Sequence, residues 1–243
     1  MQTWGLTDPG NIRQQNQDAY AIVPFGRDRV LMIVCDGMGG AKSGNVASSL
    51  AVEVFTDEVR RTQKAGMSPE KASAMLRSAL ELANRAVFEQ SQLSEDFTGM
   101  GTTLVAAWLN RDLAVIINVG DSRAYHFTKE DVRLVTRDHS MVAYMVERGE
   151  LTQEQAKLHP GKNVITRAVG TEPEVEGDVF TCRLRRDECI LLCSDGLSNE
   201  MADQEMLFEV VHGLNKSDCC QRLLHIAKKR GAPDNVTVTL AAV

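Results

Sequence analysis

The sequence has few of the features that divide a chain or direct it to a membrane. No stretch rich in proline, serine and glycine, no low-complexity run and no short-period repeat interrupts its 243 residues, so we expect one domain over residues 1–243. No apolar run is long enough to span a bilayer, and the N-terminal stretch lacks a charged-then-apolar signal pattern. The net charge of -6 argues against broad binding to nucleic acid or membrane surfaces.

The cysteines and histidines also lack the spacing of a metal site. The six cysteines contain no CxxC pair, and the five histidines show no ligand spacing. Cys35 and Cys193 lie inside apolar runs, so we expect buried free thiols. Together with the missing signal pattern, these features predict a cytoplasmic protein that binds neither nucleic acid nor membrane.

Apolar periodicity predicts strands in runs and helices in pairs. Helices are expected at 45–62, from the N-cap pair Ser68-Pro69 onward, and at 202–213 and 217–230. The segment 138–162 is polar and helical, with a capping box at Thr152 and Gln155. Strands are expected at 19–25, 29–35, 102–109, 112–119, 122–127, 132–136, 178–184, 189–194 and 235–243. This order favours two stacked sheets covered by helices over alternating βαβ units.

Aspartates stand at the ends of several of these strands. The apolar run 30–35 leads into Asp36-Gly37, and the run 189–193 leads into Ser194 and then Asp195-Gly196. Asp121 follows a third run, Asp234 precedes the last strand, and Asp18 precedes the first. Each aspartate alone is also typical of a turn or a helix cap. The repetition predicts instead that five carboxylates meet at one edge of the sheets.

Carboxylates that meet repel one another and are costly to desolvate unless a cation lies among them. A set of ligands made only of oxygen suits magnesium, manganese or calcium, whereas zinc more often recruits cysteine or histidine. The glycine after Asp36 permits close backbone approach, so the Gly37 carbonyl is a further candidate ligand.

The motifs around these aspartates resemble a known family. GNIR (10–13) and NQD (16–18) are followed in order by VCDGMGG, GMGTTLVAA, NVGDSRAY, RDHS, ITRAVG, LLCSDGL and DNVTV. In this order they resemble compact bacterial members of the metal-dependent protein phosphatases (PPM), the type-2C serine/threonine phosphatases. The resemblance implies an α+β fold, a four-layer αββα sandwich of two stacked antiparallel β-sheets flanked by pairs of antiparallel helices.

The resemblance also implies an active site with two core manganese or magnesium ions and a third ion beside them. Asp36 would bridge the core ions, the Gly37 carbonyl would bind one, and Asp195 and Asp234 would hold the other. Asp18 would lie in or near this inner shell. Asp121, with Asp195, would form the third site. Each of these residues lies in one of the motifs quoted above.

By the same resemblance, Arg13 would bind the substrate phosphate, and the segment 138–163 would form a flap over the active site. Arg13 has the alternative of a solvated loop arginine, and the flap that of a surface excursion without substrate contact. Two divalent ions can lower the pKa of a shared water, which would then attack phosphorus in line with the serine or threonine oxygen.

The sequence departs from the family at three positions. Gln17 stands where glutamate is usual, while Met38 and Ala41 stand where different groups of relatives have histidine, which leaves the general acid unassigned. We expect a monomeric phosphatase that acts on phosphorylated serine and threonine in proteins and opposes a bacterial serine/threonine kinase. The alternatives are a non-catalytic pseudophosphatase that binds phosphoproteins, and a regulator of a partner switch.

Overall fold

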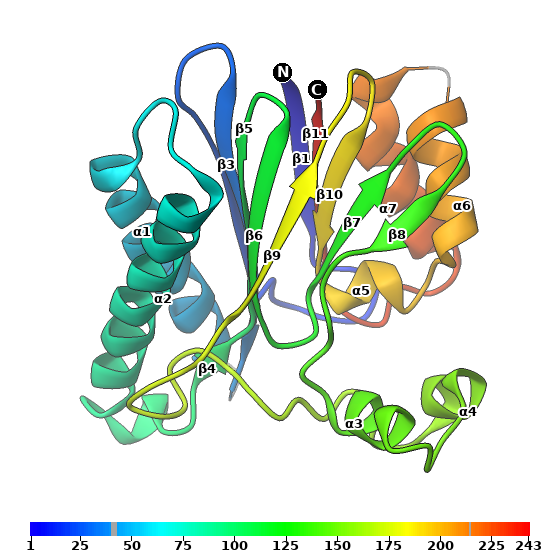
Figure 1. The fold of residues 1–243 in the computed structure, drawn as a ribbon. Helices are drawn as coiled ribbons and strands as arrows, with labels where there is room; N and C mark the ends of the chain where they lie inside the picture. The colour runs from blue at the N-terminus through cyan, green and yellow to red at the C-terminus, as the bar shows by residue number, and fades with distance from the viewer. Residues whose placement is uncertain (40–42, 214) are drawn as a thin grey trace.

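The fold consists of two stacked β-sheets with helices on both outer faces (Figure 1). The computed structural model describes residues 1–39, 43–213 and 215–243. All strand pairs within the two sheets are antiparallel across the described part of the chain. The α+β sandwich expected from the sequence is confirmed.

The first sheet has the order β2-β3-β5-β6-β9. Its strands are β2 (Asp18–Pro24), β3 (Arg29–Met38), β5 (Leu104–Asn110), β6 (Leu113–Val119) and β9 (Asp178–Arg183), and the short β4 (Gly101–Thr102) pairs with the end of β3. On β3, Leu31 and Ile33 pack under the helices, whereas Met32 and Val34 pack between the sheets. Because both faces of β3 are buried, its sequence is a continuous apolar run and does not alternate.

The second sheet has the order β1-β11-β10-β7-β8. Its strands are β1 (Gln2–Asp8), β7 (Arg123–Phe127), β8 (Val132–Leu134), β10 (Cys189–Cys193) and β11 (Val236–Ala242). The strand β1 was not expected from the sequence, and Asp18 therefore belongs to the second strand of the chain. β1 is an edge strand of mostly half-buried residues, so its sequence QTWGLTD carries little apolar signal.

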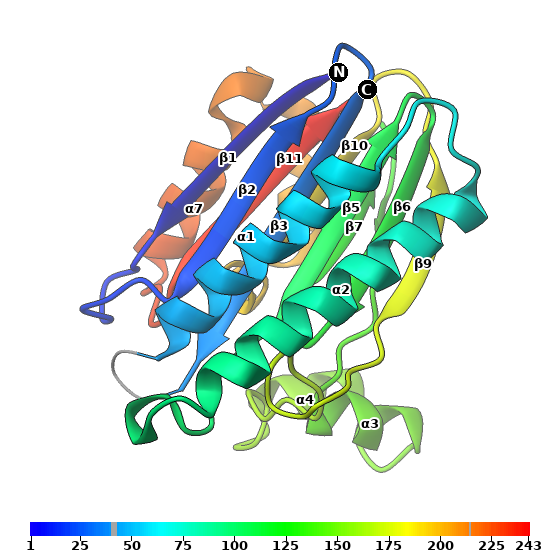
Figure 2. The same ribbon diagram turned by 90° about the vertical axis from the view of Figure 1, so that its left-hand side faces the viewer.

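The helices α1 (Gly44–Thr62) and α2 (Pro69–Ser91) run antiparallel across the first sheet (Figure 2). As predicted, Ser68 caps α2, because its side chain accepts a hydrogen bond from the Lys71 amide. The second sheet is covered by α6 (Asp203–Leu207), which continues as a π-helical turn (Phe208–His212), and by α7 (Cys219–Lys229). Short 3₁₀ turns lie at Glu95–Phe97 and Lys216–Asp218.

Two further helices, α3 (Met141–Glu147) and α4 (Gln153–Leu158), stand away from the sheets at one end of the sandwich (Figure 1). The capping box of Thr152 and Gln155 is present at the start of α4. The short helix α5 (Asp195–Ser198) lies at the same end and follows β10. None of the helices that the structure describes is both long and apolar enough to cross a membrane.

Candidate active site

Asp18 and Asp36 lie directly opposite each other on neighbouring strands. They are partners in the antiparallel register of β2 and β3, and β3 continues past Asp36 to Met38, whereas the sequence placed Asp36 after the strand. Asp18 Oδ2 accepts hydrogen bonds from Ser194 Oγ at 2.7 Å and from Thr237 Oγ1 at 2.6 Å. Its second oxygen, Oδ1, is buried without a hydrogen-bond partner. Asp18 therefore presents one unsatisfied oxygen to the cluster of acids.

The two Asp-Gly pairs mark places where backbones from different elements touch. A side chain on Gly37 would collide with the carbonyl oxygen of Gly44, at the start of α1. A side chain on Gly196 would collide with the carbonyl oxygen of Asn235, just before β11. Glycine is required at both positions because no Cβ fits. The first contact sets Asp36 beside the start of α1, and the second sets Asp195 beside the segment that carries Asp234.

Asp195 has a hydrogen-bond partner on one oxygen only, whereas both oxygens of Asp234 have one, because its Oδ1 accepts from the Asn235 amide at 2.9 Å. Asp195 is the first residue of α5, and its Oδ2 accepts a hydrogen bond from Asn199 Nδ2 at 3.0 Å, while its Oδ1 is buried without a partner. Asp234 Oδ2 accepts from Arg13 Nη2 at 2.8 Å, and the Arg13 side chain is 55% exposed. Arg13 thus stands at the rim of the carboxylate cluster, open to solvent.

Asp121 lies in a loop that is held from both sides. The preceding residue, Gly120, has a backbone φ of +99°, and its amide donates to His139 Nδ1 at 3.1 Å. The His139 amide donates back to the Gly120 carbonyl at 2.9 Å. Burial lowers the pKa of His139, and its Nε2 lies 3.3 Å from both Asp178 Oδ2 and Arg167 Nη1. His139 therefore positions the loop and is too enclosed to protonate a substrate.

A pair of buried hydroxyls links the Asp121 loop to Asp36. Ser122 Oγ and Thr103 Oγ1 lie 2.7 Å apart, and the Asp36 amide donates to Thr103 Oγ1 at 2.9 Å. The Thr103 amide in turn donates to the Asp36 carbonyl at 2.9 Å. Thr103 is thus shared between the backbone of Asp36 and the residue that follows Asp121.

Burial and the charges of neighbouring carboxylates raise the pKa values of four of the aspartates. Burial and the charges of Asp18 and Asp195 raise the pKa of Asp36 well above its ordinary range. Burial raises the pKa of Asp18 to about 6 and that of Asp121 to about 7, with the charge of Asp195 adding to both. Burial and the charge of Asp234 likewise raise the pKa of Asp195.

The side chains of the five aspartates are not arranged around a common metal-binding position. Among the residues that the structure describes, no three acidic, histidine or cysteine side chains are grouped closely enough to hold a metal ion as they stand. Asp234 points to Arg13, and Asp18 points to Ser194 and Thr237. The backbone places all five aspartates at one end of the sandwich, while several of their side chains bond to other partners.

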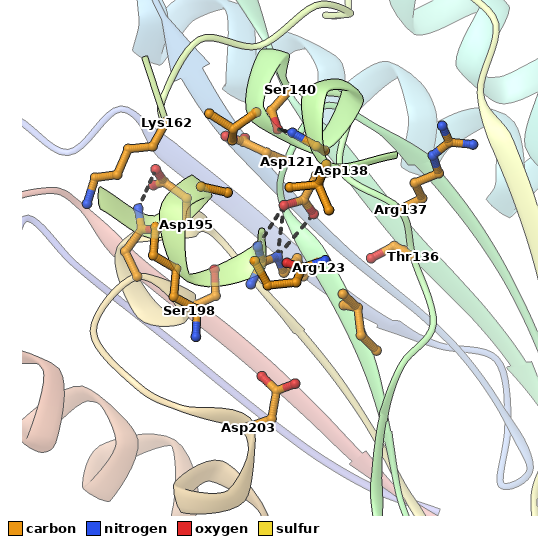
Figure 3. Close-up of a pocket in the computed structure, with 18 of the residues that line it drawn as sticks. Asp121, Arg123, Thr136, Arg137, Asp138, Ser140, Lys162, Asp195, Ser198 and Asp203 are labelled. Carbon is orange, nitrogen blue, oxygen red and sulfur yellow. Dashed lines mark hydrogen bonds and ion pairs between the residues drawn. The ribbon is translucent and has the colours of Figure 1, made fainter. Parts of the chain in front are cut away.

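A cavity of about 790 Å³ opens beside Asp121 and Asp195 (Figure 3). One wall comes from the segment with α3 and α4, the other from α5 and the start of α6, and the floor comes from the start of β7 and the end of β8. The predicted flap segment thus lines a cavity that reaches two of the predicted site residues.

The chain is similar to known phosphatases over almost its whole length. Residues 12–231 match the protein phosphatase 2C family. The chain belongs to this family. The serine/threonine phosphatase stp of Listeria welshimeri is 37% identical, over 96% of this chain and 92% of the relative. The protein phosphatase PhpP of Streptococcus pneumoniae is 33% identical, over 98% of this chain and 96% of the relative.

Solved phosphatase structures share the fold. The serine/threonine phosphatase Stp1 from Staphylococcus aureus superposes with a TM-score of 0.92 at 35% identity, covering 99% of this chain and 94% of that chain. The catalytic domain of the phosphatase PstP, solved in complex with 2 manganese ions, superposes with a TM-score of 0.84 at 30% identity, covering 99% of this chain and 97% of that chain. The prediction of a protein serine/threonine phosphatase, made from the order of the motifs, is confirmed.

The sequence did not reveal several residues that hold the phosphatase site together. Thr103, Ser122 and His139 lie within the family motifs, but nothing in their spacing showed that they position Asp36 and Asp121. Asn235 was also missed, although its side chain bonds to the backbone of Pro9, Gln15 and Gln17 and so fixes the loop that carries Arg13. Of the three departures from the family pattern, Ala41 lies outside the described residues.

Proposed function

We propose that this phosphatase hydrolyses phosphoserine and phosphothreonine in proteins with divalent cations held by its aspartates. The observation that carries the proposal is the convergence of Asp18, Asp36, Asp121, Asp195 and Asp234 at one end of the sandwich, next to a solvent-exposed arginine. Mutually repelling buried carboxylates reduce stability, so their assembly at one place is expected where cations bind.

The donor set fits hard cations such as manganese or magnesium. All candidate ligands are oxygens, and Asp18 and Asp195 each have one buried oxygen without a hydrogen-bond partner. Asp36, the Gly37 carbonyl, Asp195 and Asp234 would hold two core cations, with Asp36 between them. Asp121 would hold a third together with Asp195, and Asp18 would lie beside the core pair. When bound, such cations lower the pKa of a water molecule toward neutrality and offset phosphoryl charge.

Arg13 would bind the phosphoryl oxygens of the substrate. Its guanidinium is half exposed and bonds to a single oxygen of Asp234, so it can turn to a bound phosphate without leaving a buried group unpaired. A guanidinium fork suits the geometry of a phosphate group. The structure offers no free histidine at this position for leaving-group protonation among the described residues, because His139 is engaged on both ring nitrogens.

We also propose that residues 138–163 act as a flap on a single phosphatase domain spanning residues 1–243. The support is the cavity that α3 and α4 share with Asp121 and Asp195. A serine/threonine kinase that phosphorylates the same proteins is the proposed opposing enzyme, and a monomer in the cytoplasm is the proposed state. All six cysteines are free and buried, as expected in a reducing compartment.

The test measures colour release from p-nitrophenyl phosphate and phosphate release from phosphothreonine peptides, each with manganese and then with excess chelator. We expect turnover with manganese, none with chelator, and none for Asp36→Asn in either condition. A wild-type protein that binds manganese and phosphopeptide but releases no phosphate would be the pseudophosphatase. The serine/threonine phosphatases among its relatives argue against that alternative.

A further inference from the structure

The cavity beside the carboxylates carries an uneven distribution of unpaired charge. Its lining includes Asp121 and Asp195, so it adjoins the residues proposed to hold the cations and the phosphoryl group. Its volume of about 790 Å³ lies within the range of sites that bind small molecules or short peptide segments. We call this cavity, between the α3–α4 segment and the α5–α6 segment, the side groove.

Most charged groups at the centre of the side groove already have partners. Arg123 donates to both oxygens of Asp138, with Nη2 to Oδ2 at 2.7 Å and Nε to Oδ1 at 3.0 Å (Figure 3). Arg137 is paired with Glu147 on α3. Each of these two ion pairs has no net charge. A charged ligand would therefore gain little binding energy from either pair unless it broke the pair.

Two lysines on the flap wall differ from these ion-paired residues because their charges are unpaired among the described residues. Lys157 lies in the last turn of α4 and Lys162 follows it, and both line the side groove and are exposed. In the part of the chain that the structure describes, neither ammonium group has a salt-bridge or hydrogen-bond partner. The opposite wall contributes two carboxylates that have no cationic partner, Asp195 at the start of α5 and Asp203 at the start of α6. The flap wall is therefore basic, and the opposite wall is acidic.

Between these walls the groove is lined by apolar side chains. They come from β8, α3, α4 and the turn after α5, and include Leu134, Val142, Val146, Ala156 and Met201. An extended polypeptide advances about 3.3 Å per residue, so residues adjacent to a bound phosphoresidue would fall on this lining and against the lysines.

We propose that the side groove binds the substrate polypeptide next to its phosphorylated residue, and that Lys157 and Lys162 select substrates with acidic side chains there. This inference rests on the proposed phosphatase function. The occupant is an extended, acidic segment of a phosphoprotein, because the unpaired charge on the flap wall is positive. Since both lysines are exposed, the preference is modest and decreases with salt.

The test compares phosphothreonine peptides of one sequence that carry glutamate, glutamine or lysine at the flanking positions, on either side. The readout is the ratio of kcat/KM for the glutamate peptide to that for the glutamine peptide, measured at low salt. A ratio cancels any general loss of activity in a variant. We expect a ratio of about 3–10 for the wild type, since two exposed ion pairs contribute modestly, and a ratio near 1 for the double variant Lys157→Ala, Lys162→Ala.

Two variants provide matched controls. Lys129→Ala removes an exposed lysine in the β7–β8 turn, outside the side groove, and should leave the ratio at its wild-type value. Asp203→Asn removes the carboxylate of the opposite wall that lies outside the candidate metal site, and it should raise the ratio. Thermal unfolding of each variant checks that the fold is intact.

Equal kcat/KM values for the three peptides with the wild type would overturn the inference, and so would a preference that survives the double lysine variant. Tight binding of a non-peptide anion at the lysines, without any peptide preference, would also overturn it. These results are distinct from a failure of the proposed function, in which the wild type with manganese would not hydrolyse p-nitrophenyl phosphate at all.

Discussion

Replacing Asp18 by asparagine should stabilise the phosphatase when cations are removed, although it alters the site. Asp18 is 8% exposed, and its neighbours include Asp36, Asp195 and Asp234. An asparagine oxygen can accept the hydrogen bonds from Ser194 and Thr237 that Oδ2 now accepts. Its amide group would replace the unpartnered Oδ1 and can donate to a neighbouring carboxylate.

The size and pH dependence of this gain follow from the raised pKa. Burial raises the pKa of Asp18 from 3.8 to about 6, which corresponds to about 3 kcal/mol lost from the free energy of unfolding at neutral pH. Between these two pKa values the folded state binds more protons than the unfolded state, so wild-type stability falls as pH rises. The gain in Asp18→Asn is therefore absent below about pH 4 and complete above about pH 7.

The assay is thermal and urea unfolding of both proteins in chelator at pH 4, 5 and 8, followed by circular dichroism. At pH 8 the variant should melt about 6–12 °C higher, because 1 kcal/mol shifts Tm by about 2–4 °C in a chain of this size. Saturating manganese should remove or reverse the gain, since cations stabilise the wild-type site more. A variant that is equally destabilised at pH 5 and pH 8 in chelator would refute the reasoning.

The remaining predictions concern turnover and cation binding. Asp36→Asn should lower kcat by more than about 100-fold in steady-state assays, and a wild-type rate would remove its bridging role. Arg13→Ala should raise KM about 10–100-fold with a smaller change in kcat, because it removes a charge-assisted contact to phosphate. An unchanged KM would show that Arg13 pairs with Asp234 and does not contact the substrate. Asp121→Ala should slow turnover while calorimetry still counts two bound cations, and a count below two would contradict the third-site assignment. Manganese titrations should show weaker binding at pH 6 than at pH 8, because protons compete for Asp121, whose pKa is raised to about 7; equal affinity would exclude that carboxylate.

Local patterns predicted most of the secondary structure. The run in β3 and the capped start of α2 at Ser68 could be predicted because burial and capping act within a few residues. The edge strand β1 could not, since its pairing with β11 joins residues at opposite ends of the chain. The π-helical turn after α6 was likewise not visible, because the 202–213 segment has an ordinary helical pattern.

The repeated Asp-Gly pairs drew attention to Asp36 and Asp195 in the sequence but did not indicate how these residues are held. Gly37 and Gly196 are required by contacts with Gly44 and Asn235, which no neighbouring residue in the sequence indicates. Hydrogen bonds between separate elements link Ser122 through Thr103 to Asp36. Another such bond joins the Gly120 amide to His139. These hydrogen bonds could not be predicted from the sequence, because they form only when the strands and loops pack together in the folded protein.

The sequence alone therefore determined the family and most of the strand and helix content, because side-chain chemistry and periodicity are local properties of the chain. The tertiary structure alone decided that Asp18 opposes Asp36, that Arg13 reaches Asp234, and that two unpaired lysines share a groove with Asp121 and Asp195. Distances between residues far apart in sequence depend on how the whole chain packs, and the energies of buried charges depend on those distances.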